Sequence, residues 1–270
     1  MDIIGTIPLF DEPIDYGAVR YRRQGSMQER VQDAVQDEAL FAVFVNGILT
    51  MQLGCSPSCL VELVVGRLFT EGVIETIDDI DAITVCEESM RADVVLHDSR
   101  VPDFSREAEH VVTTCCTNNA TLNEYYADYA GLEPVAPVPW DANWVFAIAD
   151  EFAKDKTAHA RTQGAHSAYL ADRSGILYMR EDIGRHNAFD KVVGAALIGG
   201  VDLSDCLLYT SGRVPTDMAV KAVRARIPLL LSKSVATDKA IELAKSTQLT
   251  LICRATPASF DVMFNPCAAT

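Results

Sequence analysis

Two successive units of an apolar strand, a short polar loop and a helix constrain the fold near the end of the chain. "CLLYT" leads through "SGRV" into "PTDMAVKAVRAR", and "IPLLLS" leads through "KSV" into "ATDKAIELAKS", before the apolar run "LTLIC". Strands that are separated by a single helix pair in parallel, and their right-handed crossovers bring the intervening loops to one edge of the sheet. This pattern predicts an α/β domain that binds its ligand at the carboxyl edge of the strands.

The chain is expected to divide at a proline-rich segment. "EPVAPVPW" holds three prolines in eight residues, which excludes an ordinary helix or a central strand. After it, "NWVFAIADEFAKDK" has the pattern of an amphipathic helix, and "HSAYLADRSGILYM" that of a hairpin with its turn near Arg173 to Gly175. We therefore expect a smaller domain over residues 1–136 and a larger α/β domain over 137–270.

The part of the chain before that boundary combines a hairpin with a helix. In "ALFAVFVNGILTMQL", Asn46-Gly47 is a strong turn signal between two apolar arms. Ser56-Pro57 then introduces a helix with apolar residues at helical spacing, which Gly72 ends. Two further strands and a polar loop are expected over 80–86, 92–97 and 98–110, and "ATLNEYYADYAGL" is weakly helical. The smaller domain is thus expected to be α+β.

Composition excludes several classes of partner. The net charge is -15, and binding to DNA, RNA or an anionic membrane needs a positive surface. The start of the chain has no basic region followed by an apolar run, and no stretch approaches 18 apolar residues, which predicts a cytoplasmic protein. Its eight cysteines are then expected to be free thiols. Cys86, Cys206 and Cys253 are interpreted as small core residues.

The densest polar cluster is "REDIGRHNAFDKVVGAALIGG". Asn187 is a good N-cap, and Asp190 three positions later could reach back to it, which predicts a helix that begins just after Asn187. Arg185 and His186 would then lie in the loop at the positive end of this helix, which is a favourable place for an anion. The alternative is that Asp182, Arg185 and Asn187 pair with one another to hold the turn.

The loops that follow add components of a phosphate site. Arg213 and Lys233 follow two of the strands, and Lys191 and Lys221 lie early in neighbouring helices, so we expect four cations around the same edge. Hydroxyl groups and a close backbone approach come from Ser211, Gly212, Ser232, Ser234 and Thr237. These components predict a nucleotide or another polyphosphate as the ligand. No loop matches GxxxxGK[ST] or GxGxxG, which argues against the common NTPase and dinucleotide sites.

Zinc chemistry is not expected. A zinc deaminase needs H-x-E together with P-C-x-x-C, and none of the five histidines is followed two positions later by Glu. The Cys55-x3-Cys59 pair has no second half at zinc spacing. We therefore expect a site that holds no metal ion of its own.

Two adjacent cysteines, Cys115 and Cys116, stand in the polar stretch "TTCCTNNATL". Adjacent α-carbons are about 3.8 Å apart, which is below the roughly 4.4–6.8 Å that disulfides prefer. A bridge between them would be strained, so the pair suits a single activated thiolate with a neighbouring thiol as helper. Polar neighbours and a nearby helix start would favour such a thiolate, although a loop cysteine is often inert.

Several motifs in order make the chain similar to the formate dehydrogenase accessory sulfurtransferases, the FdhD family. "EDIGRHNAFDKVVGAAL" resembles the most specific motif of the family, and "SGRVPTDMAVKA", "IPLLLSKSVATDKAIELA" and "TLIC" follow in the family's order. "VNG" and "PSCLVELVVGRLFTEGVI" resemble its N-terminal signature, and "TQGAHSAYL" its TGG-x-H segment. The resemblance runs from about residue 38 to the end of the chain.

This resemblance implies a fold, a substrate and partners. The larger domain would be a three-layer α/β/α domain of the cytidine-deaminase type without zinc. The protein would carry persulfide sulfur from a cysteine desulfurase to the bis-molybdopterin guanine dinucleotide form of the molybdenum or tungsten cofactor, which formate dehydrogenase needs. A homodimer would be consistent with it. The cofactor site would include the loop residues named above and also His166, Cys253, Arg254, Thr256 and Phe260.

The chain departs from the family pattern at the cysteine loop. The family has C-x-x-C, whereas here Cys115 takes the first position, Cys116 follows it, and Asn118 stands in place of the second cysteine. The leading hypothesis is a sulfurtransferase with Cys115 as persulfide carrier and Cys116 as auxiliary thiol. One alternative is a cofactor chaperone without enzymatic activity that has lost sulfur transfer. A thiol-redox protein is a third possibility, which the geometry of adjacent cysteines disfavours.

Overall fold

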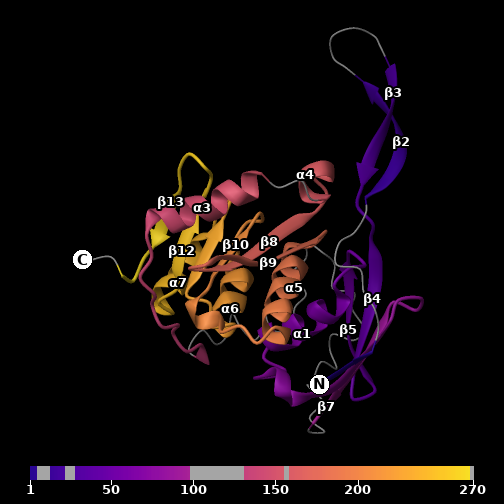
Figure 1. The fold of residues 1–270 in the computed structure, drawn as a ribbon, viewed down its shortest axis with the longest axis horizontal. Coiled ribbons are helices and arrows are strands. Elements are labelled where there is room, and N and C mark those ends of the chain that lie inside the picture. Colours follow the sequence, from indigo (N-terminus) through magenta and orange to yellow (C-terminus); the bar gives the residue numbers. More distant parts are fainter. Residues whose placement is uncertain (5–12, 22–27, 98–130, 155–157, 268–270) are drawn as a thin grey trace.

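The computed structural model describes residues 1–4, 13–21, 28–97, 131–154 and 158–267. Six strands of this part form one sheet, here termed the large sheet, in the order β13-β12-β11-β10-β8-β9 (Figure 1). Its strands are β8 (His166–Asp172), β9 (Gly175–Asp182), β10 (Leu207–Thr210), β11 (Leu229–Ser232), β12 (Thr250–Cys253) and β13 (Asp261–Phe264). β10, β11 and β12 are parallel, and β8 with β9 forms an antiparallel hairpin, as the sequence predicts.

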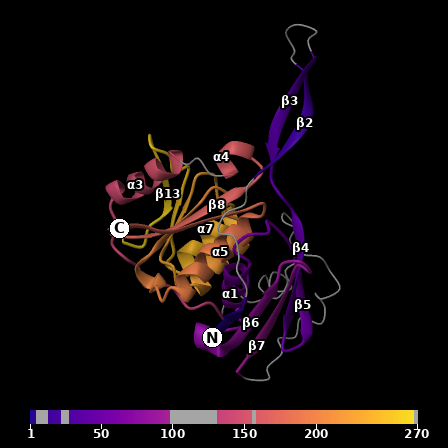
Figure 2. The same ribbon diagram turned by 45° about the vertical axis from the view of Figure 1, so that its right-hand side comes forward.

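Helices cover both faces of the large sheet. α3 (Ala142–Ala153) lies on one face, and the other is covered by α5 (Arg185–Ile198), α6 (Thr216–Arg224) and α7 (Asp238–Ser246), as Figure 2 shows. The strand residues alternate accordingly: Tyr209 and Leu231 pack with α3, whereas Leu208 and Leu230 pack with the other helices. Such fully buried strands are continuous apolar runs in the sequence. The expected three-layer α/β/α arrangement is therefore confirmed.

A second sheet, here termed the small sheet, belongs to the first part of the chain. Its strands are β1 (Asp2–Ile4), β4 (Ala39–Val45), β5 (Ile48–Cys55), β6 (Ile80–Cys86) and β7 (Arg91–Leu96), in the order β1-β6-β7-β4-β5. Asn46 and Gly47 join β4 to β5 with φ angles of 49° and 82°, the left-handed values that a two-residue hairpin turn needs. The helix α1 (Leu60–Thr70) packs on this sheet. The α+β expectation is confirmed.

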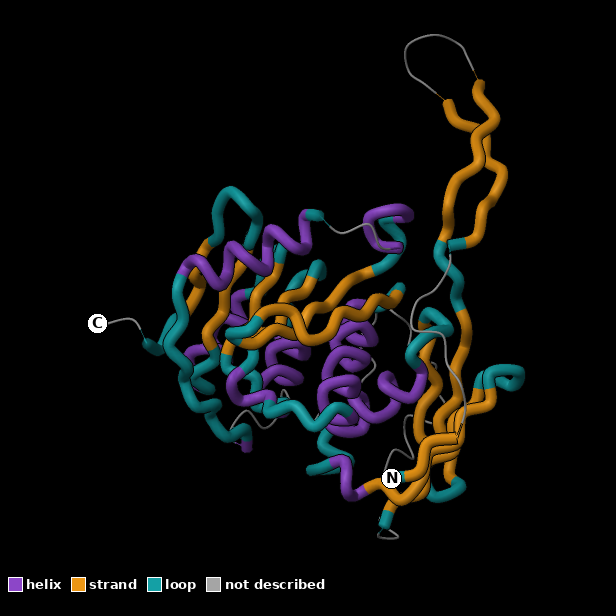
Figure 3. The backbone as a smooth tube through the Cα atoms, in the orientation of Figure 1, coloured by secondary structure: helices purple, strands orange, loops and turns teal. Residues whose placement is uncertain are grey.

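The helix α1 joins the small sheet to the larger unit. Its leucines and valines pack against the small sheet, and its opposite side lies along α5 (Figure 3). Gly66 of α1 and Gly194 of α5 face each other where the two helices cross, and a Cβ on either would overlap backbone atoms of the other helix. The absence of a side chain at both positions therefore allows the two helices to pack backbone against backbone.

A two-stranded ribbon extends away from both sheets. β2 (Ile14–Tyr21) and β3 (Gln28–Val35) pair along their whole length, and Figures 1 and 2 show the ribbon extending beyond the start of β4. The short helix α4 (Ala158–Thr162) contacts β3. Two single-turn 3-10 helices, η1 (Ile77–Asp79) and η3 (Leu203–Asp205), complete the described elements.

Two of the local predictions are wrong. The helix α5 begins at Arg185 with Gly184 as its N-cap, because the Asn187 amide donates to the carbonyl of Gly54 and to Asp182 instead of capping the helix. Cys86 is exposed, because the last residue of β6 faces solvent.

Other predictions are confirmed or lie outside the described residues. Cys206 and Cys253 are buried as expected, and Gly72 follows α1 with a left-handed φ of 77°. The cysteine pair 115–116, the predicted loop 98–110 and most of the weakly helical segment lie outside the described residues. The domain boundary after residue 136 stays a prediction.

Candidate functional site

Three loops of the large sheet meet at one edge, as the strand–loop–helix pattern predicts. They follow β10, β11 and β12 and comprise residues 211–213, 233–237 and 254–256. The parallel register of these strands puts all three loops on the same side, and the first residue of β8 and the last of β9 reach this edge from the antiparallel hairpin. We term these loops, with the start of α5, the edge site.

The loop after β10 is hydrogen-bonded to the start of β8. His166 opens β8, and its Nδ1 lies 3.2 Å from the Oγ of Ser211. The same oxygen accepts a hydrogen bond of 3.0 Å from the backbone N–H of Ser167, whose carbonyl accepts from the N–H of Ser211. His166 and Ser211, which were predicted from distant motifs, are therefore neighbours.

Hydrogen bonds also join the loops after β10 and β11. The Ser232 hydroxyl donates to the carbonyl of Gly212 at 2.7 Å and accepts from the N–H of Ser234 at 2.8 Å. The N–H of Gly212 donates to Thr210 Oγ1 at 3.1 Å. The Ser232 hydroxyl thus holds the shape of the two loops, and Thr210 is a contributor that the sequence analysis missed.

Arg185 has an unsatisfied nitrogen in this site. It is the first residue of α5, and its Nε is buried without a hydrogen-bond partner among the described residues. Gly212 leaves room for it, because a Cβ there would lie 2.9 Å from Arg185 Cβ and 3.0 Å from its Cδ. No side chain caps the N-terminus of α5. A buried guanidinium nitrogen beside an uncapped helix start favours an anionic ligand.

His186 is held by a carboxylate that the sequence analysis did not select. Its Nε2 lies 2.6 Å from Asp217 Oδ2, and the other oxygen of Asp217 accepts from the N–H of Met218 at 2.9 Å. Burial alone would raise the pKa of Asp217, but the hydrogen bond from His186 and the charges of His186 and Arg185 hold it below its usual value. The position of Asp217 in the first turn of α6, after Pro215, was the available sequence signal.

Lys191 and Lys221 do not line the edge, so that prediction is wrong. Lys191 is completely buried and forms an ion pair of 2.7 Å with Asp182, which also accepts from the N–H of Gly184. Lys221 is buried between Asp190 and Glu71, at 2.9 Å and 3.0 Å. Lys191 Nζ also donates to the carbonyl of Ser56 at 3.1 Å, so both lysines bind residues of the first part of the chain.

Asp182 and Asn187 hold the turn before α5, as the alternative interpretation proposed. Asp182 accepts from the N–H groups of Gly184 and Ser56 and from the Asn187 amide. Arg185 takes no part in this network among the interactions that the structure describes. The hydrogen bonds that hold the turn therefore leave the Arg185 side chain out.

The remaining predicted residues differ in the exposure of their side chains and in the partners that those side chains already have. Arg213 is exposed, and Lys233 is exposed with its Nζ 5.1 Å from the centre of the Phe152 ring. Arg254 is paired with Asp261 at 2.6 Å, and the Thr237 hydroxyl caps α7 by accepting from the N–H of Ala240. Two further residues form local contacts: the Thr256 hydroxyl bonds the backbone of Ser259, and Phe260 packs on Trp140 and Phe146.

The described cysteines differ in reactivity. Burial raises the pKa of Cys253 at the edge site to about 11, and that of Cys59 and Cys206 to about 12, so these thiols stay protonated at neutral pH. Cys86 is exposed, and hydrogen bonds with Ser89 lower the pKa of its thiol. Cys86 is therefore a thiol that any test of cysteine chemistry in this protein must control for.

The family of the chain follows from a comparison of the whole sequence. The model of the FdhD/NarQ family matches residues 36–267, which include the whole large sheet, the small sheet apart from β1, and the entire edge site. The chain belongs to the FdhD/NarQ family. The resemblance inferred from the sequence motifs is confirmed.

Relatives within the FdhD/NarQ family cover most of the chain. A sulfur carrier protein FdhD from Geobacillus kaustophilus is 31% identical over 233 residues, covering 86% of this chain and 88% of its own. The protein of the same name from Bacillus subtilis is 30% identical over 237 residues, covering 88% and 90%. That from Listeria innocua is 30% identical over 237 residues, covering 87% and 90%.

The fold is shared with a solved structure. A crystal structure described as a formate dehydrogenase accessory protein, from Desulfotalea psychrophila, has a TM-score of 0.76 to this chain and 24% sequence identity. The match covers 96% of this chain and 98% of that one. The mixed α/β fold of the FdhD/NarQ chain is therefore that of this structure over nearly its full length.

The described residues contain neither a metal-binding cluster nor a membrane-spanning helix. Within those residues, no group of three or more His, Cys, Asp or Glu side chains is placed to hold a metal ion. None of the described helices is both long enough and apolar enough to cross a membrane.

Proposed function

We propose that this FdhD/NarQ protein carries persulfide sulfur from a cysteine desulfurase to the molybdenum or tungsten bis-molybdopterin guanine dinucleotide cofactor, for maturation of formate dehydrogenase. The observation that carries the proposal is the buried, unpartnered Nε of Arg185 beside the uncapped start of α5. The names of the relatives, sulfur carrier proteins, supply the reaction class.

The cofactor is the substrate in this proposal, and its phosphates would bind at the edge site. Arg185, the His186 ring held by Asp217, and the exposed Arg213 are cationic or hydrogen-bonding groups that converge on this edge in a chain of net charge -15. Backbone N–H groups at a helix start and guanidinium groups are the donors that phosphates select. The guanine end of the cofactor would bind here, which leaves the metal end directed away from the helix start.

The sulfur would travel on Cys115. The Cys115 thiolate attacks the outer sulfur of the desulfurase persulfide, a new S–S bond forms on Cys115, and the donor cysteine leaves as a thiolate. This exchange is electron-neutral and needs no external oxidant. Cys116 would act as an auxiliary thiol in place of the second cysteine of the family pattern, at which this chain has Asn118. A cytoplasmic location and a homodimer belong to the proposal.

The second candidate function is a cofactor chaperone without sulfur transfer. Asn118 favours it, because a relay that depended on two cysteines at C-x-x-C spacing would be lost in this chain. The edge site would still bind the guanine dinucleotide. The two candidates therefore differ only in the chemistry of Cys115.

An intact-mass measurement distinguishes the sulfur carrier from the cofactor chaperone. The protein is incubated with a cysteine desulfurase and cysteine, and the mass gained as sulfur is compared for the wild type and the variants Cys115→Ala, Cys116→Ala and Cys86→Ala. The proposal expects sulfur on the wild type and on Cys86→Ala, and none on Cys115→Ala. Sulfur that disappears only with Cys86→Ala would assign it to the exposed thiol instead.

A binding measurement completes the test. GDP is titrated into the wild-type protein by calorimetry as a probe of the guanine dinucleotide. GDP binding without sulfur uptake would favour the chaperone. Absence of GDP binding would contradict both candidates. A reversible loss of two hydrogen atoms from Cys115 and Cys116 in the mass spectrum, as a disulfide forms, would favour a thiol-redox protein.

A further inference from the structure

The His186–Asp217 pair joins the starts of α5 and α6. His186 is the second residue of α5, and Asp217 is the second residue of α6. Their side chains are 16% and 9% exposed, and the distance from His186 Nε2 to Asp217 Oδ2 is 2.6 Å. The hydrogen bond between them is therefore largely shielded from water, at the edge where the ligand is expected.

Asp217 determines which nitrogen of His186 carries a proton. Burial opposes the charge of Asp217, but the hydrogen bond from His186, the charges of His186 and Arg185, and the N–H of Met218 keep its pKa below the usual value. An ionised carboxylate can only accept hydrogen bonds. Nε2 must therefore carry a proton, because two acceptors 2.6 Å apart would repel each other.

Nδ1 is the nitrogen of His186 that is left for a ligand. It has no hydrogen-bond partner among the described residues. Because Nε2 is fixed as a donor, the ring gains or loses its second proton at Nδ1. The protonated ring presents an N–H group there, which an anion accepts, whereas the neutral ring presents a lone pair, which repels an anion.

The neighbouring charges make this proton decisive. Arg185 precedes His186 and has a buried Nε without a partner among the described residues. Together with Asp217, these side chains carry one positive charge when the His186 ring is protonated and none when it is neutral. The starts of α5 and α6 are therefore cationic only in the protonated state.

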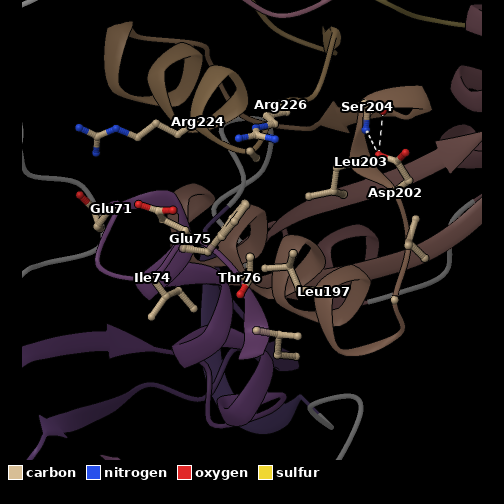
Figure 4. Close-up of a pocket in the computed structure, with 16 residues that line it drawn as sticks. Glu71, Ile74, Glu75, Thr76, Leu197, Asp202, Leu203, Ser204, Arg224 and Arg226 are labelled. Carbon is tan, nitrogen blue, oxygen red and sulfur yellow. Dashed lines mark hydrogen bonds between the residues drawn. The ribbon is translucent and has the colours of Figure 1, made fainter. Parts of the chain in front are cut away.

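The opposite ends of these helices show no such imbalance. A cavity of about 640 Å³ lies where α1, α5 and α6 end, and Figure 4 shows Arg224 and Arg226 there with Glu75 and Asp202. The charges of these four residues balance, and Glu71 is already neutralised in an ion pair. The cavity therefore gives no preference for an anion, in contrast to the helix starts.

We propose that phosphate binding at the edge site takes up a proton on Nδ1 of His186, and that Asp217 is the residue that positions the ring for it. This inference rests on the proposed function, because the phosphate belongs to the guanine dinucleotide. Nε2 donates to Asp217, and Nδ1 donates to a phosphate oxygen beside Arg185. The proton comes from solvent, and no covalent bond of the ligand changes. Affinity for the phosphate therefore falls as the pH rises and the ring becomes neutral.

Calorimetric titration of GDP in buffers of different ionisation enthalpy measures the protons taken up. Between about pH 7 and 9 the terminal phosphate of GDP is already largely ionised, because such groups titrate near pH 6. The wild type is expected to take up part of one proton per GDP in this range, and His186→Gln none. GDP affinity of His186→Gln should be about tenfold weaker than that of the wild type at the acid end and equal to it at the alkaline end.

His97→Gln is the matched control for the loss of a histidine. His97 also lies 2.6 Å from a carboxylate, that of Asp81, but this pair is exposed and belongs to the small sheet. Proton uptake and GDP affinity of His97→Gln should equal those of the wild type. Melting temperatures without GDP show whether each variant is folded.

Asp217→Asn tests the positioning of the ring. The asparagine amide can donate to Nε2, which leaves the neutral ring with its proton on Nδ1. Proton uptake on GDP binding should therefore decrease. Nitrogen-15 NMR of the histidine rings, with His186→Gln to assign the signals, should show a protonated Nε2 in the wild type and a protonated Nδ1 in the neutral ring of Asp217→Asn. A purely structural role would lower stability without moving the proton between the nitrogens.

The outcomes separate this inference from the proposed function. GDP that binds the wild type without proton uptake, or with the same uptake in His186→Gln, would overturn the inference and leave the proposed function intact. A neutral wild-type ring with its proton on Nδ1 would overturn the role of Asp217. Absence of GDP binding to the wild type would overturn the proposed function, and this inference with it.

Discussion

Gly66 of α1 and Gly194 of α5 lie backbone against backbone, and a Cβ on Gly194 would overlap the carbonyl of Glu62. Tight interiors respond to an inserted methyl group by shifting backbone, which costs about 1–3 kcal/mol or more. This contact therefore controls how α1 and its small sheet attach to the larger unit.

Replacement of Gly194 by Ala is expected to lower the free energy of unfolding by about 3 kcal/mol or more. Urea denaturation followed by circular dichroism measures it. Gly17→Ala is the matched control, because a Cβ at Gly17 meets no atom within 4 Å. Equal midpoints for Gly194→Ala and Gly17→Ala would mean that the helices separate at no cost.

Lys221→Met is expected to destabilise the protein by about 3–5 kcal/mol, because it leaves the buried carboxylate of Asp190 with one cation fewer. Lys239→Met removes the lysine of an exposed ion pair with Glu242 and should change stability by less than about 1 kcal/mol. The comparison uses the same denaturation measurement. A loss for Lys221→Met no greater than that for Lys239→Met would contradict the described network.

Arg185→Ala is expected to weaken binding of GDP by about tenfold or more, because it removes a charged donor at the start of α5. Titration calorimetry gives the affinity. Arg20→Ala on the ribbon is the control for the loss of one positive charge at a distance. Similar affinities for the two variants would move the nucleotide site away from the edge site.

The pH dependence of stability should report on Asp217. Its pKa is lower in the folded protein than in the unfolded chain, so its ionised form stabilises the fold above the unfolded pKa. That contribution is lost as the pH falls through the lowered pKa of the folded state. The difference in unfolding free energy between the wild type and Asp217→Asn is therefore expected to be largest near neutral pH and to shrink in acid.

Asp33→Asn serves as the control for that measurement, because Asp33 is an exposed carboxylate on the ribbon. Its difference from the wild type should stay small at every pH. A difference for Asp217→Asn that grows as the pH falls would have the wrong sign and would contradict the lowered pKa of Asp217.

Local pattern was sufficient for the parallel strands of the large sheet, although β13 was not predicted. The alternation of apolar strands and helices over 206–253 predicted the parallel strands β10, β11 and β12 and the edge at which their loops meet. Asn46-Gly47 likewise predicted the hairpin of β4 and β5. In both cases the signal lies within a few residues of the feature, because periodicity and turn preference are local properties of the backbone.

The start of α5 shows where local pattern misleads. Asn187 and Asp190 have the spacing of a helix cap, yet Asn187 bonds the carbonyl of Gly54, and Asp190 pairs with Arg67 and Lys221. The sequence around Asn187 contains no pattern that predicts those distant partners. The same holds for Lys191, which the sequence placed among the exposed cations and the structure buries against Asp182.

The sequence by itself determined the family, the alternation of strands and helices from β10 to β12, and the edge at which their loops meet, since each depends on short motifs or on periodicity. Only the tertiary structure decided which polar residues of α5 and α6 have no partner and which form ion pairs or hydrogen bonds with the first part of the chain. The reason is that α5 is covered on one side by the large sheet and on the other by α1, so its polar side chains must find partners more than 100 residues away. Burial of charge is favourable only when such a partner is present, and that pairing is a property of the folded chain.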